Sequence, residues 1–287
     1  MTRPYRSVLY IPGSKERALE KARDLPVDAI IFDLEDAVAP EEKAAARATL
    51  ARFLDEVEYA PRARIVRING FDTPWGRDDA AAFAAHPGVE AILVPKVNGP
   101  ADLDAVAAVA GDKPLWAMME TAAGILNAAA IAAHPRLEGM VMGTNDLAKE
   151  LGSRFRADRM PLITGLGLCL LAAKAQGRVI VDGVYNAFRD EAGLRAECAQ
   201  GRDMGFDGKT LIHPAQVEIA NAAFAPSAEE VDLAERQIAA FNAAQAQGQG
   251  VAVLDGRIVE NLHVVSAQAL LAKARVIAQQ RIAVGAD

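Results

Sequence analysis

Short apolar runs alternate with longer alanine-rich segments along most of this chain. The runs are rich in valine, isoleucine, leucine and methionine, and the segments between them have helical periodicity. Strands that are apolar on both faces are typical of a parallel sheet covered by helices on either side. The eight runs are SVLYIPG (7–13), DAIIFDLEDAV (28–38), ARIVRING (63–70), AILVPKV (91–97), PLWAMMET (114–121), GMVMGTND (139–146), VIVDGVYN (179–186) and KTLIHP (209–214).

The number of strand–helix units separates two candidate folds. An open, doubly wound sheet that binds a dinucleotide carries a GxGxxG motif after its first strand, and none follows residues 7–13. Eight units within residues 1–225 fit a closed barrel, which typically needs ~250 residues. We therefore predict an α/β protein with a (β/α)8 (TIM) barrel as its catalytic domain.

Residues 226–287 are not needed to complete a barrel, and we predict a C-terminal helical extension there. Ser227 followed by Glu230 forms a capping-box pattern that predicts a helix start. A glycine-rich break, a short strand with a turn and a final helix follow. We interpret the segment at about 248–263 as a lid or as an arm exchanged between subunits. An ordinary packing appendage is the alternative.

Composition and charge exclude some partners. The net charge is −7 and the basic residues are scattered, which disfavours a nucleic acid or a membrane as the partner. No apolar stretch approaches the ~18 residues of a membrane span, and no signal-peptide pattern precedes the first strand. Cys169 and Cys198 stand in apolar contexts without metal-ligand spacing. We expect reduced thiols in the core of a cytoplasmic protein.

Polar side chains stand at the end of nearly every apolar run. In a (β/α)8 barrel the carboxyl ends of the strands build the active site, so we predict that these residues converge there. The alternative, that they are strand-terminating turn residues, fits one or two of them but not the whole set. They are Ser14, Glu35, Asp36, Arg67, Asn69, Lys96, Glu120, Asn145, Asp146, Asp182 and His213.

Two of these residues predict a metal site. Glu120 and Asp146 end successive strands, which lie ~4.8 Å apart in a sheet. Two carboxylates so close raise each other's pKa unless a cation neutralises them. Two oxygen ligands, with water and substrate in the remaining positions, are how Mg²⁺ is usually held, with Mn²⁺ as the alternative ion. A proton-sharing acid pair, or ion pairs to Arg67 and Lys96, are the competing interpretations.

Arg67 stands at the mouth of its strand, where a guanidinium can hold a carboxylate through two parallel hydrogen bonds. It can also serve as the internal partner of Asp33, Glu35 or Asp36, and both roles are compatible. Three acids at one strand end need cations, so we assign at least one of them to orienting Arg67 or a metal-bound water. Arg67 and Asp36 are therefore candidate catalytic residues.

The segment PGSKERALEKA suggests an anion site. Ser14 is a candidate helix N-cap, and Lys15, Arg17 and Lys21 follow it. Free amides at a helix start together with cations suit a phosphate. A solvated helix face is the alternative. His213 fits a structural strand-end role better than that of a base.

With these residues in hand, the chain resembles the citrate lyase β-subunit-like branch of the HpcH/HpaI aldolase superfamily, which includes malyl-CoA lyases. The similarity covers nearly the whole chain. The motifs that carry it are SVLYIPGS, DAIIFDLEDAVAPEEKAAAR, VRINGFDTPW, ILVPKV, METAAGILN, GTNDLA, DGVYNAF, GFDGKTLIHPAQV, NAAFAPSAEEV and LDGRIVE. The wording of METAAGILN, GTNDLAKELGSRFR and DGRIVENLH is most similar to the malyl-CoA thioesterase members.

The resemblance implies a Mg²⁺-dependent barrel that forms a homotrimer or hexamer. It implies that the positions of Glu120 and Asp146 bind the metal and that the position of Arg67 holds the substrate carboxylate. It also implies that coenzyme A, as part of an acyl-CoA substrate, contacts the positions of Tyr10, Lys15 and Lys21. We include Ser14, Glu120 and Asn145 with these residues as candidate contacts of the substrate.

In this family a lid from the neighbouring subunit brings an acidic residue to the site. The lyases usually carry aspartate there, whereas this chain has Glu260. The extra methylene moves the carboxylate by about one bond length, and errors near ~1 Å can cost about 100-fold in rate. This substitution weakens the case for carbon–carbon chemistry and leaves thioester hydrolysis open.

Three functions follow from these residues. The first is a Mg²⁺-dependent lyase that cleaves or forms a carbon–carbon bond in a malyl-CoA-type 3-hydroxyacyl-CoA. The second is a hydrolase that converts (3S)-malyl-CoA to malate and coenzyme A, with Glu260 or a neighbouring acid activating water. The third is a partner-dependent subunit of the citrate lyase β type.

Overall fold

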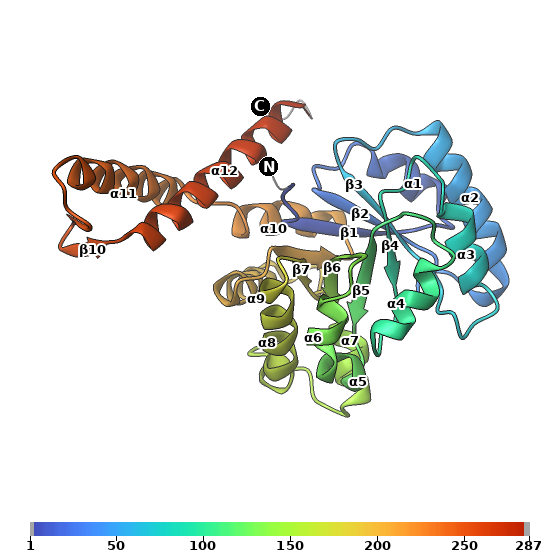
Figure 1. Cartoon of the computed structure of the whole chain (residues 1–287). Helices are drawn as coiled ribbons and strands as arrows, with labels where there is room; N and C mark the ends of the chain where they lie inside the picture. Colours follow the sequence, from blue (N-terminus) through green and yellow to red (C-terminus); the bar gives the residue numbers. More distant parts are fainter. Residues whose placement is uncertain (1–2, 284–287) are drawn as a thin grey trace. The chain divides into compact units, whose positions relative to one another are not determined.

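The framework of the molecule is a closed barrel of eight parallel strands (Figure 1). The computed structural model describes residues 3–283. Each strand pairs with the next along the chain, and β8 returns to pair with β1. The predicted (β/α)8 barrel is therefore confirmed. Its strands are β1 (Ser7–Pro12), β2 (Ala29–Asp33), β3 (Ala63–Arg67), β4 (Ala91–Val94), β5 (Leu115–Met119), β6 (Leu137–Met142), β7 (Val179–Asp182) and β8 (Gly208–Leu211).

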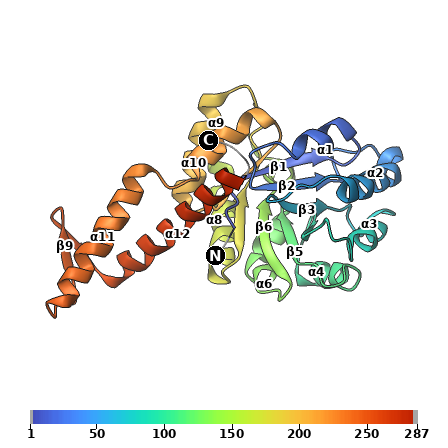
Figure 2. The ribbon, with the colours of Figure 1, turned by 90° about the horizontal axis from the view of Figure 1, so that it is seen from above.

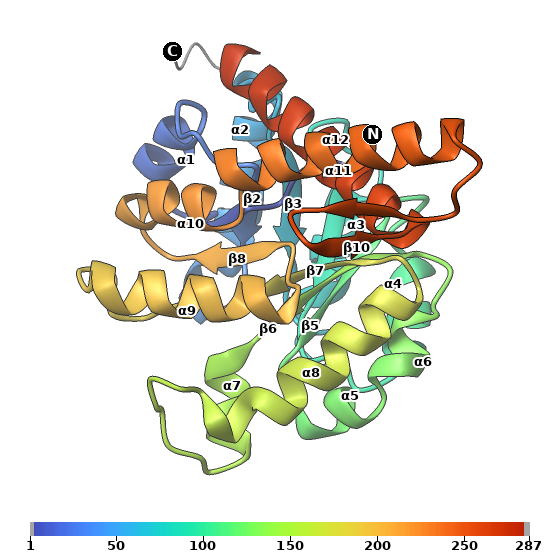
Figure 3. The same ribbon diagram turned by 90° about the vertical axis from the view of Figure 1, so that its left-hand side faces the viewer.

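Helices follow the strands around the outside of the barrel, as the view in Figure 2 shows for α1 to α4. Two helices, α9 and α10, pack beside each other next to β8 (Figure 3). The barrel helices are α1 (Glu16–Ala22), α2 (Lys43–Glu56), α3 (Gly76–Phe83), α4 (Pro100–Ala107), α5 (Ala122–Leu126), α6 (Ala128–Ala132), α7 (Thr144–Glu150), α8 (Met160–Ala175), α9 (Glu191–Met204) and α10 (Val217–Ala223), with short 3₁₀ helices η1 (Pro40–Glu42) and η2 (Pro214–Gln216).

Alternate strand residues build two apolar layers. Ile31, Leu93 and Val181 belong to a buried cluster inside the barrel. Their strand neighbours, such as Ile30 and Ile92, belong to a second buried cluster between the strands and the helices. Because successive side chains of a strand point to opposite faces, both faces must be apolar. This explains why the strand segments lack the polar alternation of a half-exposed sheet.

Local signals start and end the helices, and one predicted signal is wrong. The carboxylate of Asp190 accepts the N–H of Gly193 at 3.0 Å at the start of α9, and a left-handed Gly205 ends that helix. Ser14, in contrast, does not cap α1. The N–H of Lys15 donates to the carbonyl of Pro12 at 3.2 Å, so Ser14 lies inside a turn and Lys15 takes the N-cap position.

Residues 225–283, together with residues 3–4, form a second compact unit, separate from the barrel unit Tyr5–Phe224. It contains α11 (Ala228–Ala246), α12 (Asn261–Ala283) and an antiparallel hairpin of β9 (Ala252–Leu254) and β10 (Arg257–Val259). The predicted capping box is confirmed, because the Ser227 hydroxyl accepts the N–H of Glu230 and the Glu230 carboxylate accepts the N–H of Ser227.

The hairpin confirms the predicted short strand and turn. Its two-residue turn is Asp255–Gly256, and both residues have positive φ, 48° and 76°. An Asp-Gly pair with this geometry matches the right-handed twist of the flanking strands. Phe241, Val259 and Val264 form the small core beneath it.

Two expectations from composition can be compared with the structure. Cys169 and Cys198 are buried free thiols, as predicted. Within residues 3–283 we find no helix with the length and apolar character that a membrane crossing requires.

Candidate active site

A cavity of about 340 Å³ opens at the carboxyl ends of the barrel strands. This is the end at which barrels of this type place their active sites. Its wall combines charged groups from β2, β3, β5 and α7 with apolar groups from β6 and the loops after β7 and β8. The lining residues are Tyr10, Pro12, Asp33, Asp36, Ala37, Arg67, Met118, Glu120, Met142, Gly143, Thr144, Asn145, Asp146, Val184 and Ile212.

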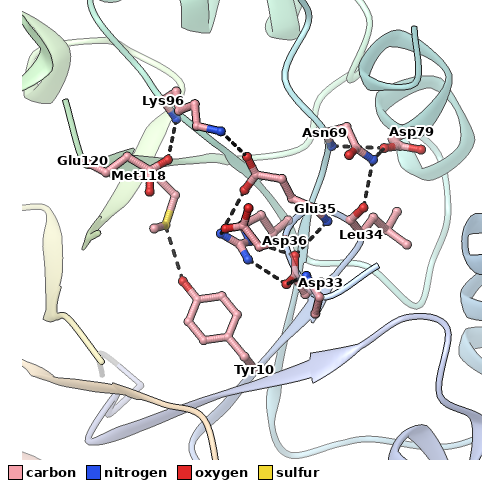
Figure 4. Close-up of polar contacts among 12 residues, drawn as sticks. Tyr10, Asp33, Leu34, Glu35, Asp36, Asn69, Asp79, Lys96, Met118 and Glu120 are labelled. Atoms are coloured by element: carbon pink, nitrogen blue, oxygen red, sulfur yellow. Dashed lines mark hydrogen bonds and ion pairs between the residues drawn. The ribbon is translucent and has the colours of Figure 1, made fainter. Parts of the chain in front are cut away.

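Three acids from the end of β2, which are labelled in Figure 4, hold Arg67. Its Nε and Nη2 donate to the two oxygens of Asp33 at 2.8 and 2.6 Å, and its Nη1 donates to Asp36 at 3.1 Å. A carboxylate oxygen of Glu35 lies 2.9 Å from the same Nη1. The prediction that at least one acid orients Arg67 is confirmed, and Asp33 does so through paired hydrogen bonds.

The acids also occupy much of the hydrogen-bonding capacity of Arg67. A guanidinium has five N–H groups, and three of those on Arg67 already donate to Asp33 and Asp36. Asp36 is the replaceable partner, because its side chain is 60% exposed whereas that of Asp33 is 2% exposed. Two N–H groups remain, one on Nη2 and one on Nη1, and Glu35 Oε2 already lies 2.9 Å from Nη1. A substrate carboxylate that binds Arg67 through two hydrogen bonds would therefore compete with the acids at Nη1, where Asp36 is the partner that solvent can reach.

Glu120 is a buried carboxylate at the end of β5. Its Oε1 accepts the backbone N–H of Lys96 at 2.8 Å. Burial, with the Glu35 carboxylate as a second cause, raises the pKa of Glu120 from 4.5 to about 7. Gly143 permits this position of the side chain, because a Cβ at residue 143 would overlap both Cβ and Oε2 of Glu120.

The charges around the cavity fit a divalent cation. Asp146 stands in the first turn of α7 on the cavity wall and is close enough to Glu120 to raise the pKa of that carboxyl. Five carboxylates face two basic side chains: Asp33, Glu35, Asp36, Glu120 and Asp146 against Arg67 and Lys96. The surplus of oxygen donors and negative charge suits a hard cation.

The donor set also narrows the kind of cation. Across the described residues there is no group of three or more histidine, cysteine, aspartate or glutamate side chains arranged to hold a metal. Two carboxylates, with water and substrate completing the coordination, are typical of Mg²⁺, whereas zinc usually takes three or four protein ligands.

The predicted substrate contacts divide into two groups. Tyr10 and Asn145 line the cavity. The ring of Tyr10 lies 5.0 Å from the Arg67 guanidinium and its hydroxyl contacts the Met118 sulfur at 3.5 Å (Figure 4); burial raises the pKa of this phenol. Lys15 and Lys21 are exposed at the start and end of α1 and do not line the cavity.

Ser14 and Asn145 have contrasting surroundings. The Ser14 hydroxyl is buried and has no hydrogen-bond partner among residues 3–283. Asn145 and Asn186 exchange hydrogen bonds between their side-chain amides at 2.8 and 3.2 Å. The hydroxyl therefore has an open bond to offer, whereas the amide is already fixed on the wall of the cavity.

Six of the eleven strand-end residues predicted to converge on the site do not line the cavity: Ser14, Glu35, Asn69, Lys96, Asp182 and His213. Glu35 and Lys96 still contact residues that do line it, Arg67 and Glu120.

Asp182 points outward from β7, where Arg159 and Lys209 neutralise it between the barrel and α9. Asn69 donates to Asp79 and to a backbone carbonyl. His213 accepts the N–H of Ala215 and caps η2. The expectation is wrong for Asp182 because it is one position from the inward-facing Val181 and so lies on the outer face of β7. Asn69 and His213 lie beyond the ends of β3 and β8, and their side chains bond to the segments that follow.

Glu260 lies in the C-terminal unit. It directly precedes α12, and its backbone N–H donates to Nδ1 of His263 at 3.0 Å, while its side chain is exposed.

The structure also identifies site residues that the sequence did not predict. Gly143 and Met118 are among them, and no polar signal marks either one.

Comparison with known proteins gives a consistent family. The model of the HpcH/HpaI aldolase/citrate lyase family matches residues 6–214. The chain is 70% identical over 278 residues to (3S)-malyl-CoA thioesterase of Cereibacter sphaeroides, covering 97% of both chains. It is 33% identical to the L-malyl-CoA/beta-methylmalyl-CoA lyase of the same species over 96% of both chains.

A solved structure resembles the whole chain. It is the CitE protein of Mycobacterium tuberculosis in complex with magnesium, acetoacetate and coenzyme A. The similarity has a TM-score of 0.80 and 32% sequence identity, and it covers 95% of this chain and 98% of the other. The citrate lyase subunit beta of Leuconostoc mesenteroides subsp. cremoris is 33% identical over 93% of this chain.

Proposed function

Because the chain belongs to the HpcH/HpaI aldolase/citrate lyase family, we propose that it hydrolyses the thioester of (3S)-malyl-CoA to malate and coenzyme A. One observation carries the choice of reaction: 70% identity to a (3S)-malyl-CoA thioesterase over 97% of both chains. The residues and motifs of the sequence alone favour the lyase reaction. The lyase relatives are only 33% identical, so we reverse that preference.

The cavity offers a seat for each part of a malyl thioester. Arg67 is assigned to the substrate carboxylate, with Asp36 giving way to it. Glu120 and Asp146 are assigned to Mg²⁺, which when bound would neutralise the acidic wall and polarise the oxygens of the ester. Their fit rests on the surplus of carboxylates around the cavity.

The remaining contacts concern the coenzyme A part of the substrate. We assign it to Tyr10, Ser14, Lys15 and Lys21, and Asn145 to the acyl part. Two lysines, at the start and end of α1, supply positive charge for phosphates. The Ser14 hydroxyl has no partner among the described residues, but it is buried, so it becomes a donor to the substrate only if its turn moves. The cavity of about 340 Å³ matches an acyl group better than a whole coenzyme A, which must extend beyond it.

Hydrolysis needs a group that takes a proton from water. The water oxygen bonds to the carbonyl carbon, the carbon–sulfur bond breaks, and the products are a carboxylate, a thiol and a proton. Asp36 is the candidate base in the barrel unit because its exposed carboxylate lines the cavity. Glu260 is the candidate from the C-terminal unit. We expect Asp36→Asn or Glu260→Gln to lower kcat by about 100-fold, depending on which residue is the base.

The oligomer is part of the proposal. We propose a homotrimer or hexamer in which the segment at about 248–263 of one subunit closes on the site of its neighbour. The positive-φ turn at Asp255–Gly256 gives this segment a defined hairpin rather than a loose loop.

A product assay tests the reaction. Purified protein is incubated with (3S)-malyl-CoA and Mg²⁺, and malate and free thiol are measured beside glyoxylate and acetyl-CoA. Equal amounts of malate and thiol support the hydrolase. Glyoxylate and acetyl-CoA would establish the lyase instead, and activity only with an acylated carrier protein would establish the partner-dependent subunit. Glu120→Ala and Asp146→Ala should each remove the activity that Mg²⁺ supports.

A further inference from the structure

Lys96 contacts two acids of the site, Glu35 and Glu120, but has no part in the proposed chemistry. It follows β4, and its backbone φ is 49°. This is the left-handed region that residues with a side chain adopt only rarely. Such a conformation persists where the surrounding structure holds it, and it is concentrated at functional sites.

The backbone of Lys96 positions Glu120. Its N–H donates to Glu120 Oε1 at 2.8 Å, and Glu120 makes no other side-chain hydrogen bond to the described part of the chain. Gly143 lies so close to the same side chain that an added Cβ would overlap Cβ and Oε2 of Glu120. The unusual turn at Lys96 therefore supplies the one donor that fixes the orientation of Glu120.

The side chain of Lys96 acts in a different direction. Its Nζ lies 3.1 Å from Glu35 Oε1, and Glu35 Oε2 lies 2.9 Å from Nη1 of Arg67 (Figure 4). Glu35 is nearly buried and bridges the two cations. One residue thus connects the carboxylate assigned to the metal with the arginine assigned to the substrate.

We propose that Lys96 is a positioning residue that sets the separation between the metal and the substrate carboxylate through two independent contacts. Its backbone orients Glu120, and its ammonium group orients Arg67 through Glu35. The identity of the two ligands rests on the proposed function, whereas the two contacts do not.

Three substitutions separate the contacts. Lys96→Met keeps the length of the side chain and removes the charge. Lys96→Gly removes the side chain and accepts positive φ without strain. Lys96→Val places a β-branched residue where positive φ is strongly disfavoured. Mg²⁺ affinity is measured by calorimetry without substrate, and KM is measured with (3S)-malyl-CoA at saturating Mg²⁺.

The two readouts should respond differently. Lys96→Met and Lys96→Gly should raise KM about two- to tenfold, the range of a partly exposed ion pair. Their Mg²⁺ affinity should stay equal or increase, because a positive charge near the cation is lost. Lys96→Val should weaken Mg²⁺ binding by about tenfold, because the shifted backbone no longer donates to Glu120.

Two further variants control the interpretation. Lys174→Met removes a half-exposed lysine that lies 2.7 Å from Asp207; neither residue lines the cavity, so both readouts should stay unchanged. In the pair Lys96→Met with Glu35→Gln, the effects on KM should not add, because both changes break the same bridge.

Each arm can fail by itself. If Lys96→Met loses as much Mg²⁺ affinity as Lys96→Val, the two contacts are not independent. If KM is unchanged in Lys96→Met and Lys96→Gly, the ammonium group does not orient Arg67. If Lys96→Val does not fold, a crystal structure of Lys96→Gly decides the backbone contact, which must keep its N–H on Glu120. If the Mg²⁺ results hold but malyl-CoA is not hydrolysed, the proposed function fails and the positioning of Glu120 stands.

Discussion

At the scale of single residues, a charged side chain at the end of an apolar strand was the signal that predicted most of the site. Glu120, Asp146, Arg67 and Asp36 were identified because polar residues at strand ends need a reason, and all four line one cavity. Asp182 was grouped with them by the same rule, yet it faces the helices. The sequence does not show at which residue of an apolar run the strand begins. It therefore does not show whether a given side chain points into the barrel or toward the helices.

The raised pKa of Glu120 leads to a prediction about metal binding. Below its pKa of about 7 in the metal-free protein, Mg²⁺ must displace a proton, so its apparent affinity should fall by up to about tenfold per pH unit. Above that pH the affinity should level off. Calorimetry at pH 6 and pH 8 measures this difference. Equal affinities at the two values would show that Glu120 is not a ligand or is not protonated.

The same carboxyl affects the stability of the metal-free protein. Its pKa is raised in the folded state from 4.5 to about 7, so folding favours the protonated form. That contribution is fully present below pH 4.5 and is lost as the pH rises through about 7. Thermal unfolding without Mg²⁺ should therefore show a higher Tm for Glu120→Gln than for the unchanged protein at pH 8. A lower Tm of this variant at pH 8 would contradict the assignment.

At the scale of elements, the strands were predictable because each is apolar on both faces, and the hairpin was predictable from its Asp-Gly turn. The left-handed conformation of Lys96 and the close approach of Gly143 to Glu120 were not. Both depend on contacts between segments that are distant in the sequence and lie close together at the end of the barrel. No pattern of neighbouring residues predicts such contacts.

Gly143 provides a test of that close approach. Gly143→Ala should push the Glu120 side chain out of place and lower activity by about 100-fold, since shifts near ~1 Å have effects of this size. The matched control is Gly167→Ala in α8, where an added Cβ meets nothing within 4 Å and alanine favours the helix. Activity and Tm of both proteins are compared. Full activity of Gly143→Ala would show that Glu120 tolerates the methyl group.

At the scale of the whole molecule, the barrel could be predicted from the number of strand–helix units. The chain divides into two compact units near residue 225, where the alternation of strands and helices ends. How subunits share their parts could not be predicted from the pattern of one chain. The proposed exchange of the lid nevertheless makes a measurable statement about mixed oligomers.

If Glu260 is the base and the lid is exchanged, a variant without Glu260 and a variant without Arg67 should restore each other. In a 1:1 mixture of Arg67→Ala and Glu260→Ala, about a quarter of the sites, one half multiplied by one half, would have both residues intact. Co-expressed chains should then regain activity that neither variant has alone. A lid that closes on its own subunit leaves the mixture inactive. Arg67→Ala with Asp146→Ala is the control, because both residues belong to the barrel and no mixture repairs a site.

The acids that surround Arg67 have a consequence for which esters the protein accepts. A guanidinium that is already neutralised attracts an arriving molecule only if that molecule carries an anion to exchange for Asp36. A neutral acyl chain offers no such exchange, so the ion pair between Arg67 and Asp36 stays in place. Arg67 thereby selects substrates at the binding step. Simple fatty or acetyl thioesters are rejected before any bond to the reacting carbon is made.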